Sequence, residues 1–134
     1  MSTIFTRIVN REITAFIVAE DEKYLAFLDI NPLAEGHTLV IPKQEIDYLF
    51  DADDELLGGM MVFAKKVAAA IRKSVVCKRV GVAVIGLEVP HAHIHLIPLQ
   101  RIDDINFSRP KLTLKNEQLV AMAAKIKSNL EERQ

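Results

Sequence analysis

Short apolar blocks with the spacing of β-strands recur along the chain and are separated by polar turns. Blocks of this kind predict strands because short apolar or alternating runs are bounded by turn residues. They cover residues 15–19, 24–30, 37–41, 79–85 and 91–97. The polar turn Asp21-Glu22-Lys23 joins the first two blocks and predicts a hairpin between them.

Apolar residues spaced by three and four positions predict helices between these strands. A short helix covers residues 3–9, with Ser2 or Thr3 as its N-cap. A long helix covers about residues 53–74, begins with acidic residues and carries basic residues in its later turns. Gly58 and Gly59 lie inside it, where each glycine costs on the order of 1 kcal/mol relative to alanine. A close crossing by another backbone and simple tolerance both explain the pair.

A last helix is predicted for about residues 116–131, with Asn116 as its cap and one apolar face. Together these elements predict an α+β fold, a mainly antiparallel five-stranded sheet with one long helix packed on it. The chain contains no repeat and no low-complexity tract, so residues 1–134 are interpreted as a single domain.

Composition and charge narrow the possible function classes. Half of the residues are hydrophobic, 26% are charged, and the formal net charge is −1. This balance is globular and predicts neither a nucleic-acid-binding nor a membrane-binding surface. There is no apolar run of transmembrane length and no signal-peptide pattern. The single cysteine, Cys77, cannot form an internal disulfide, which predicts a reducing compartment, most simply the cytoplasm.

All four histidines fall in two of the predicted strands. His91, His93 and His95 alternate with apolar residues, so on a strand their imidazoles project from one face and the apolar side chains enter the core. A helix would spread the same residues around its axis. His37 opens another apolar block. Neutral imidazoles in a row suit chemistry near pH 7.

Three interpretations of the histidine row compete. A zinc site could use His91, His93 and one further ligand, leaving an open position for catalysis. Alternatively, one imidazole attacks phosphorus while its neighbours bind the charged oxygens. The third interpretation is a set of buried structural histidines, which the grouping on one face disfavours.

The segment His91-Ala92-His93-Ile94-His95-Leu96-Ile97 matches the pattern of histidine, apolar, histidine, apolar, histidine, apolar, apolar. The sequence resembles the histidine triad (HIT) family of nucleotide hydrolases and transferases, and is most similar to its nucleoside phosphoramidase branch and the bacterial relatives of that branch. The resemblance covers roughly residues 2–100, which leaves the last helix as a C-terminal extension. Its further segments are Ile4-Phe5 with Ile8, residues 26–32, residues 36–43, and Glu88-Val89-Pro90.

The resemblance implies a role for each histidine. His93 is the expected nucleophile, and His95 is expected to hold the α-phosphate oxygens. His91 and His37 are expected behind His93, where they fix its tautomer together with a backbone carbonyl that accepts from the far ring nitrogen.

The resemblance also implies a nucleoside site. Asp29 is expected to bind the ribose hydroxyls with Ile30 beside it, although by position alone it is equally a turn residue. The base slot is expected from Ile4, Phe5, Ile8 and Phe27, which the residues alone would place in the core. Glu88 and Val89 complete the expected site. Glu88 is a candidate proton donor to a leaving amine, or else an ordinary exposed loop carboxylate.

The implied reaction is attack of imidazole on the α-phosphorus, followed by hydrolysis of the nucleotidyl-histidine intermediate. The expected substrates are purine nucleoside phosphoramidates or related nucleotidyl conjugates. A dinucleoside polyphosphate hydrolase, a weakly catalytic nucleotide-binding module and a zinc-dependent hydrolase are the alternatives.

The sequence departs from the family pattern in two places. Leu87 stands in a shortened loop where a glutamine is usual. Thr6 and Glu45 occupy places where some bacterial relatives carry structural zinc ligands, so no structural zinc and no cofactor are expected.

A homodimer with joined sheets is expected as well. The long helix has more apolar surface than one sheet contact requires, and Gly58 and Gly59 would let two such helices approach closely.

Overall fold

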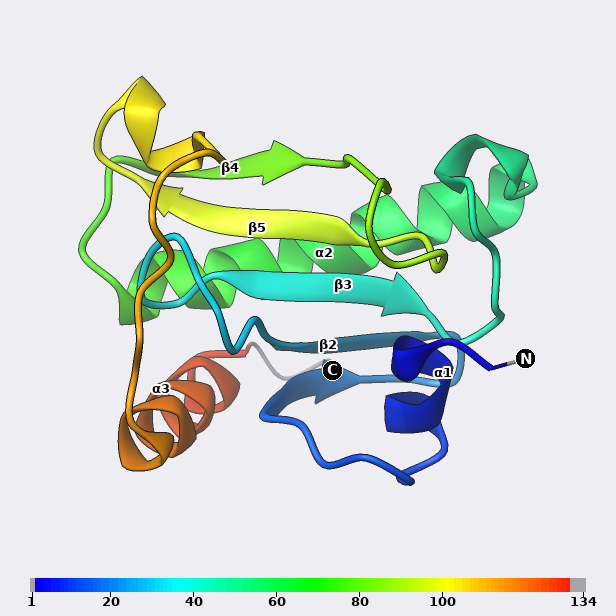
Figure 1. Cartoon of the computed structure of the whole chain (residues 1–134), viewed down its shortest axis with the longest axis horizontal. Helices are drawn as coiled ribbons and strands as arrows, with labels where there is room; N and C mark the ends of the chain where they lie inside the picture. Colours follow the sequence, from blue (N-terminus) through cyan, green and yellow to red (C-terminus); the bar gives the residue numbers. More distant parts are fainter. Residues whose placement is uncertain (1, 131–134) are drawn as a thin grey trace.

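The computed structural model describes residues 2–130, which are arranged around a five-stranded antiparallel sheet (Figure 1). The strand order is β1-β2-β3-β5-β4. The strands are β1 (Ile17–Glu20), β2 (Tyr24–Leu28), β3 (Thr38–Pro42), β4 (Arg79–Ala83) and β5 (Ile94–Leu99). The helices are α1 (Ile4–Val9), α2 (Asp54–Ser74) and α3 (Asn116–Ser128), with 3-10 turns η1 (Leu49–Asp51) and η2 (Ile102–Ile105). The predicted α+β class and the five strands are confirmed. None of these helices is long and apolar enough to cross a membrane.

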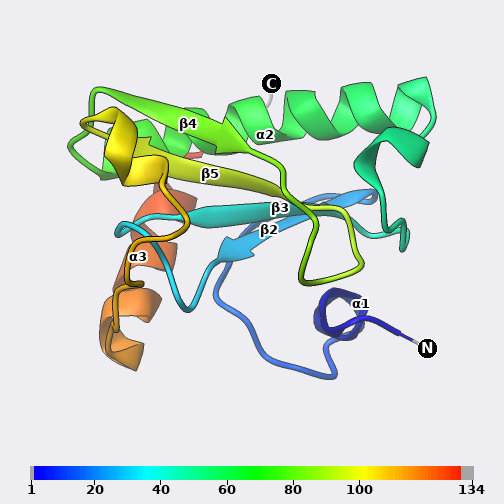
Figure 2. The ribbon, with the colours of Figure 1, turned by 45° about the horizontal axis from the view of Figure 1, so that its top comes forward.

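The two faces of the sheet carry separate apolar clusters, because side chains alternate along each strand. On one face, residues such as Val40 and Ile94 pack against Met60 and Ile71 of α2. On the other face, residues such as Phe27 pack with residues of α1. Figure 2 shows α2 and α1 on opposite sides of the sheet. The α1 face therefore holds a smaller core and leaves room for a site.

The long helix begins and ends close to its predicted bounds. Asp53 is its N-cap, and its carboxylate accepts from the Leu56 amide at 2.8 Å. Gly59 lies against Tyr24, whose hydroxyl donates to the Leu56 carbonyl, and a Cβ at Gly59 would overlap that hydroxyl. Gly58 has nothing within 4 Å of such a Cβ. Neither explanation offered for the pair is right for Gly59, because its close neighbour is a side chain.

Several predicted element ends were wrong. β5 begins at Ile94 because the preceding amides bond elsewhere: His91 donates to Val89 at 2.8 Å, and Ala92 to Ile46 at 2.6 Å. The predicted block ended at Ile97, but β5 continues to Leu99, with Pro98 opposite Val80 on the edge strand β4.

The start of the last helix also differs from its prediction. Lys115 occupies the N-cap position of α3, and its amide donates to Gln118 at 2.7 Å. The predicted cap, Asn116, is the first helical residue. The helix ends at Ser128, and the predicted end at Glu131 lies outside the described residues.

Residues 101–115, called the strap below, connect β5 to α3. In Figure 1 the strap runs from η2 past the loop between β2 and β3. Ile105 and Leu99 pack so closely on Gly81 of β4 that a Cβ there would meet both side chains. The Leu112 amide donates to the Pro32 carbonyl at 2.8 Å. The strap is therefore fastened to the sheet and to the β2–β3 loop.

Candidate functional site

The histidines gather on the α1 face of the sheet, as their spacing predicted. The β3–β5 register pairs Leu39 with His95, so the imidazole of His95 shares a face with the smaller core. Ala92 and Ile94 point the other way, into the cluster under α2. The alternation therefore holds through the triad, although the regular strand starts only at Ile94.

His37 reaches the same face from a turn. Gly36 has a φ of 94°, a left-handed conformation that favours glycine, and the chain turns there into β3. The His37 amide then donates to the Ala34 carbonyl at 3.1 Å. His37 thus lies directly before β3, beside the triad strand.

One hydrogen bond orients the ring of His93. Its Nδ1 lies 2.7 Å from the His91 carbonyl oxygen, which only accepts. Nδ1 therefore carries the proton, and Nε2 keeps its lone pair. The ring is buried and stands edge-on to Phe5 and His95, with centroid distances of 5.1 and 5.0 Å. This is the arrangement that a nucleophilic imidazole requires.

His91 is fixed by hydrogen bonds on both sides of its ring. Nε2 donates to the Pro42 carbonyl at 2.9 Å, so Nδ1 is unprotonated and accepts from the Thr3 hydroxyl at 2.8 Å. Burial lowers the pKa of His91, which keeps the ring neutral. The backbone carbonyl of His91 holds the His93 ring, as was expected of a backbone carbonyl at this place.

Thr6 and Glu45, which replace the zinc ligands of some bacterial relatives, extend this network. The Thr6 hydroxyl donates to the Glu45 carboxylate at 2.6 Å, and the Thr3 amide donates to the same oxygen at 3.1 Å. The Thr3 hydroxyl also accepts from the Thr6 amide at 3.0 Å and thereby caps α1. Hydrogen bonds thus join α1 to the triad segment.

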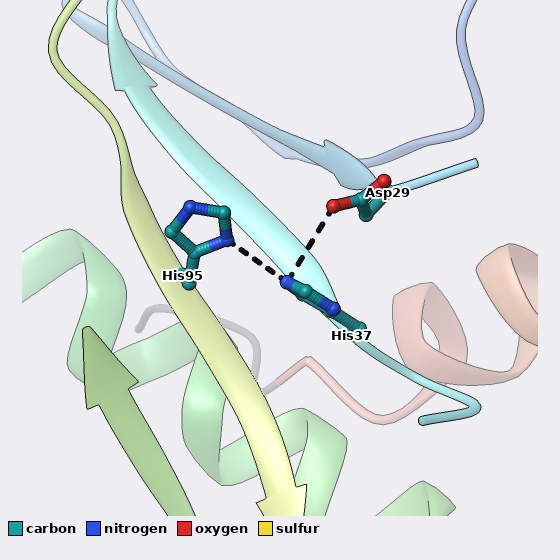
Figure 3. A group of neighbouring side chains, drawn as sticks. All are labelled: Asp29, His37 and His95. Atoms are coloured by element: carbon teal, nitrogen blue, oxygen red, sulfur yellow. Dashed lines mark hydrogen bonds and ion pairs between the residues drawn. The ribbon is translucent and has the colours of Figure 1, made fainter. Parts of the chain in front are cut away.

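A second chain of hydrogen bonds sets the tautomers of His37 and His95 (Figure 3). The Leu33 amide donates to His37 Nδ1 at 3.0 Å, so the proton of this ring is on Nε2. His37 Nε2 donates in turn to His95 Nδ1 at 2.9 Å, which leaves the proton of His95 on Nε2. Burial lowers the pKa of His37 to about 3 and that of His95 to about 4, so both rings are neutral at pH 7.

This chain corrects the predicted place of His37. It was expected behind His93, but its ring is hydrogen-bonded to His95. His37 pairs with His95 because the register of β3 and β5 places the start of β3 beside His95.

Asp29 follows β2 and points toward His37 (Figure 3). Its Oδ2 lies 3.6 Å from His37 Nε2, and its Oδ1 accepts from the Asn31 amide at 2.8 Å. Burial raises the pKa of Asp29, and the Asn31 amide opposes that effect. Asp29 is therefore a turn residue and also a neighbour of the histidine group.

The predicted base-slot residues divide into buried and exposed ones. Phe5, Ile8 and Phe27 are buried in the smaller core, as their apolar character alone suggested, and the two phenylalanine rings meet edge-on at 5.4 Å. Ile4 is exposed, at 49%, and so is Ile30, which was expected beside Asp29, at 59%. Ile4 and Ile30 each offer exposed apolar surface, and the other three base-slot residues are part of the smaller core.

The loop before the triad places its two predicted residues differently. Val89 is half-buried against the smaller core. Glu88 is exposed, and Leu87 beside it is 87% exposed. The structure thus brings Val89 to the site and leaves Glu88 as a loop carboxylate, whose charge still acts on Asp29.

A metal fits the histidines poorly. Within the described residues, one group could hold an ion: Asp29, His37 and His95, with donor atoms within 4.8 Å of one another. Metal on His37 Nε2 would move its proton to Nδ1, where it would face the Leu33 amide N–H. In the other candidate set, both nitrogens of His91 and Nδ1 of His93 already make hydrogen bonds. These donors favour imidazole chemistry over a metal centre.

Sequence reasoning missed Thr3 as a partner of His91 and Phe107 as a neighbour of His95. The Phe107 ring stands edge-on to the rings of His95 and His37, with centroids 4.8 and 6.3 Å away. Its signal was weak, a lone aromatic residue within a polar stretch.

An apolar cavity of about 850 Å³ opens beside His93. Its lining includes Tyr48, Phe50, Leu57, Met61, Val84 and Ile85. The site is thus bordered by a second apolar surface, formed by η1, α2 and the end of β4.

Comparison with known proteins identifies the family. The family model of the HIT domain matches residues 10–102. The chain belongs to the HIT family. HIT proteins act on nucleotides, so the triad geometry described above is that of a nucleotide-processing domain.

Similar HIT proteins include one from Borreliella burgdorferi, an uncharacterized HIT-like protein that is 37% identical over 95% of this chain and 97% of its own length. An adenosine 5′-monophosphoramidase of Saccharomyces cerevisiae is 42% identical over 71% of this chain and 61% of its own length. A HIT-like protein of Bartonella henselae has a solved structure that superposes with a TM-score of 0.83. It shares 33% identity and covers 96% of this chain and 97% of that one. The resemblance inferred from the triad is therefore confirmed.

Proposed function

We propose that this protein is a nucleotide hydrolase or transferase that acts at the α-phosphate of purine nucleoside phosphoramidates or related nucleotidyl conjugates. The observation that carries the proposal is the bond from His93 Nδ1 to the His91 carbonyl. It leaves the lone pair of His93 Nε2 available beside a neutral His95, whose Nε2–H is available to donate. The phosphoramidase among the relatives supports this substrate class.

The first step forms a covalent intermediate. Nε2 of His93 attacks the α-phosphorus, a nitrogen–phosphorus bond to the enzyme forms, and the bond to the leaving amine breaks. Positive charge develops on the His93 ring, where the His91 carbonyl stabilises the Nδ1–H. His95 Nε2–H donates to a non-bridging phosphate oxygen. The leaving amine takes up a proton from the solvent, since Glu88, the donor suggested by the sequence, is an exposed loop carboxylate.

The second step returns the enzyme to its starting state. Water attacks the phosphorus, the bond to His93 breaks, and nucleoside monophosphate and a proton are released. The hydrogen bonds from Leu33 and His37 keep His95 in its donor tautomer through both steps. Because the donors are fixed before substrate binds, little reorganisation is needed in the transition state.

The nucleoside end of the substrate is assigned to Asp29 and the apolar residues near α1. Asp29 would accept hydrogen bonds from the ribose hydroxyls, with Ile30 beside it. The base would lie on the apolar surface of Ile4 above Phe5, with Ile8, Phe27 and Val89 supporting it. Free nucleic acid is not expected to bind, given the net charge of −1.

A substrate comparison tests the proposal. Purified protein should hydrolyse adenosine phosphoramidate faster than a dinucleoside polyphosphate, and a chelator should not change the rate. Acid-labile nucleotidyl-protein should accumulate after rapid quenching. Faster cleavage of the polyphosphate would favour the alternative substrate class, and binding without turnover would favour a nucleotide-binding module. Chelator-sensitive activity with stoichiometric zinc would contradict the mechanism.

We also propose a homodimer. The dimer would cover exposed apolar residues of η1, α2 and β4, such as Phe50 (69% exposed), Met61 (47%) and Val82 (51%). Gly58 has open space around it, as a close helix contact would need. The cytoplasm remains the expected location because Cys77 is the chain's single cysteine.

A further inference from the structure

The strap lies directly against the Asp29, His37 and His95 group. Phe107 packs its ring edge-on against His95, with centroids 4.8 Å apart. A few residues later, the Leu112 amide donates to Pro32, in the loop that follows Asp29. The HIT family match ends at residue 102, so this wall of the site is supplied by the chain beyond the family domain.

The histidines alone cannot balance the charge of a phosphate. Burial lowers the pKa values of His37, His95 and His91, so these rings are neutral at pH 7. They donate hydrogen bonds but bring no positive charge. A nucleotide remains anionic throughout the proposed reaction, so a nearby cation would stabilise both its binding and its transition state.

Lys111 of the strap carries such a charge. Burial has the largest effect on two pKa values near the site: it raises that of Asp29 and lowers that of His37. The positive charge of Lys111 adds a smaller effect and lowers both pKa values. The Lys111 ammonium donates hydrogen bonds to the carbonyl oxygens of Phe107 and Arg109, at 2.8 and 3.3 Å. The side chain of Lys111 is exposed and flexible, so it can exchange these carbonyls for another acceptor.

The neighbouring basic residue of the strap is already engaged. Arg109 lies 3.2 Å from an oxygen of Asp104 and 3.5 Å from one of Asp103. These ion pairs stay within the strap and hold its turn in shape. Arg109 is therefore a support for the segment. Lys111 is the strap cation held at the carbonyl of Phe107, whose ring contacts His95, and it directly precedes Leu112, which is bonded to Pro32.

We propose that the strap is part of the substrate site, with Phe107 as the wall behind His95 and Lys111 as the residue that binds the phosphate of the nucleotide. The proposal rests on the proposed nucleotide function. It adds a charge-recognition residue outside the HIT domain. A nucleotide should therefore bind more tightly than its uncharged nucleoside, by an amount that depends on Lys111.

Binding of adenosine monophosphate and of adenosine, measured by calorimetry, tests this role. Lys111→Gln should weaken binding of the monophosphate about fivefold to tenfold and leave adenosine binding unchanged. The affinity of the wild type for the monophosphate should fall as salt rises, and that of the variant should fall less. Lys111→Arg keeps the charge and should retain the preference. Lys115→Gln, on the same strap, is the matched control and should behave as the wild type.

The possible outcomes separate the two proposals. An unchanged preference for the monophosphate in Lys111→Gln overturns the role of Lys111 and leaves the nucleotide site intact. An equal loss for both ligands also overturns it, because a structural defect would explain that loss. Failure of the wild type to bind either ligand contradicts the proposed function and the strap proposal together.

Discussion

At the residue scale, the site is defined by which nitrogen of each histidine carries its proton. The Leu33 amide forces the proton of His37 onto Nε2, and His37 passes the same constraint to His95. The His91 carbonyl independently holds the proton of His93 on Nδ1. A lone pair and an N–H donor therefore lie side by side, and backbone groups fix both.

Phe107 provides the first prediction at this scale. Phe107→Ala should let water reach His95, so the pKa of that ring should rise from about 4 toward its ordinary value of 6.5. A histidine titration followed by NMR measures the shift. Phe50→Ala, which removes an exposed ring lying against Tyr48, is the control and should leave His95 unchanged. An unaltered His95 titration in Phe107→Ala would show that the strap does not shield the site.

The sequence predicted the faces of these residues better than their partners. Alternation placed the triad histidines on one side and Ala92 with Ile94 on the other, because the period of a strand is local. The pairing of His37 with His95 depends on the β3–β5 register, which joins segments far apart in the chain. The contact of Thr3 with His91 depends on how α1 docks, and a polar threonine gives no sign of that.

At the element scale, α1 is tied to the triad segment through its own N-cap. The Thr3 hydroxyl accepts from the Thr6 amide and donates to His91 Nδ1. One side chain thus caps the helix and helps to hold the His91 ring, whose tautomer is set by the Pro42 carbonyl. The short helix is positioned against the catalytic segment by this bond as well as by the packing of Phe5 and Ile8.

Thr3→Val tests this link. It keeps the shape of the side chain but removes the helix cap and the shorter of two hydroxyl contacts to His91 Nδ1, leaving the Thr6 hydroxyl at 3.3 Å. The free energy of unfolding should therefore fall by about 1 to 3 kcal/mol. The kcat should fall more than KM changes, since the His91 ring keeps its bond to the Pro42 carbonyl but loses its shortest hydrogen bond on the other side. Thr3→Ser restores the hydroxyl and should recover both values. Steady-state kinetics and urea unfolding provide the measurements, and a Thr3→Val enzyme with wild-type kcat would contradict the positioning role.

The pairing of β3 with β5 gives a second prediction at this scale, a pH dependence of stability. Both His37 and His95 have pKa values below 6.5 in the folded protein. Their contribution to the free energy of unfolding is complete above about pH 6.5 and is lost as the pH falls. At lower pH the unfolded chain binds protons at these histidines, whereas the folded protein does not. Each histidine should lower the free energy of unfolding by on the order of 1 kcal/mol per pH unit between about pH 6 and 4.

His37→Gln isolates one of these two histidines. Urea unfolding at several pH values should give a smaller slope for the variant, by close to one proton. The wild type is the reference at each pH. If both proteins lose stability with the same slope, His37 is not held neutral by the fold.

At the scale of the whole molecule, the site lies between α1 and the strap on the face of the sheet opposite α2. The sheet and the long helix followed from periodicity, since both patterns extend over many residues. The strap did not, because residues 101–115 are polar and irregular and their position depends on contacts with Gly81, His95 and Pro32. The exposed apolar residues of η1, α2 and β4 are the surface that the proposed dimer would bury.

The dimer is the prediction that belongs to this scale. Size exclusion with light scattering should give about twice the chain mass of 15.1 kDa. Met61→Glu would bury a charge in the proposed interface and should shift the protein toward monomer. Val120→Glu changes a residue of similar exposure on α3 and should not. A monomeric wild type at micromolar concentration would leave the apolar face of α2 without a role.

The central claim is that His93 is the nucleophile, and hydrolysis of adenosine phosphoramidate by His93→Ala tests it most directly. The account predicts a rate at least about a thousandfold below the wild type, with nucleotide binding and the folded structure retained. A folded His93→Ala protein that hydrolyses the phosphoramidate near the wild-type rate would contradict it.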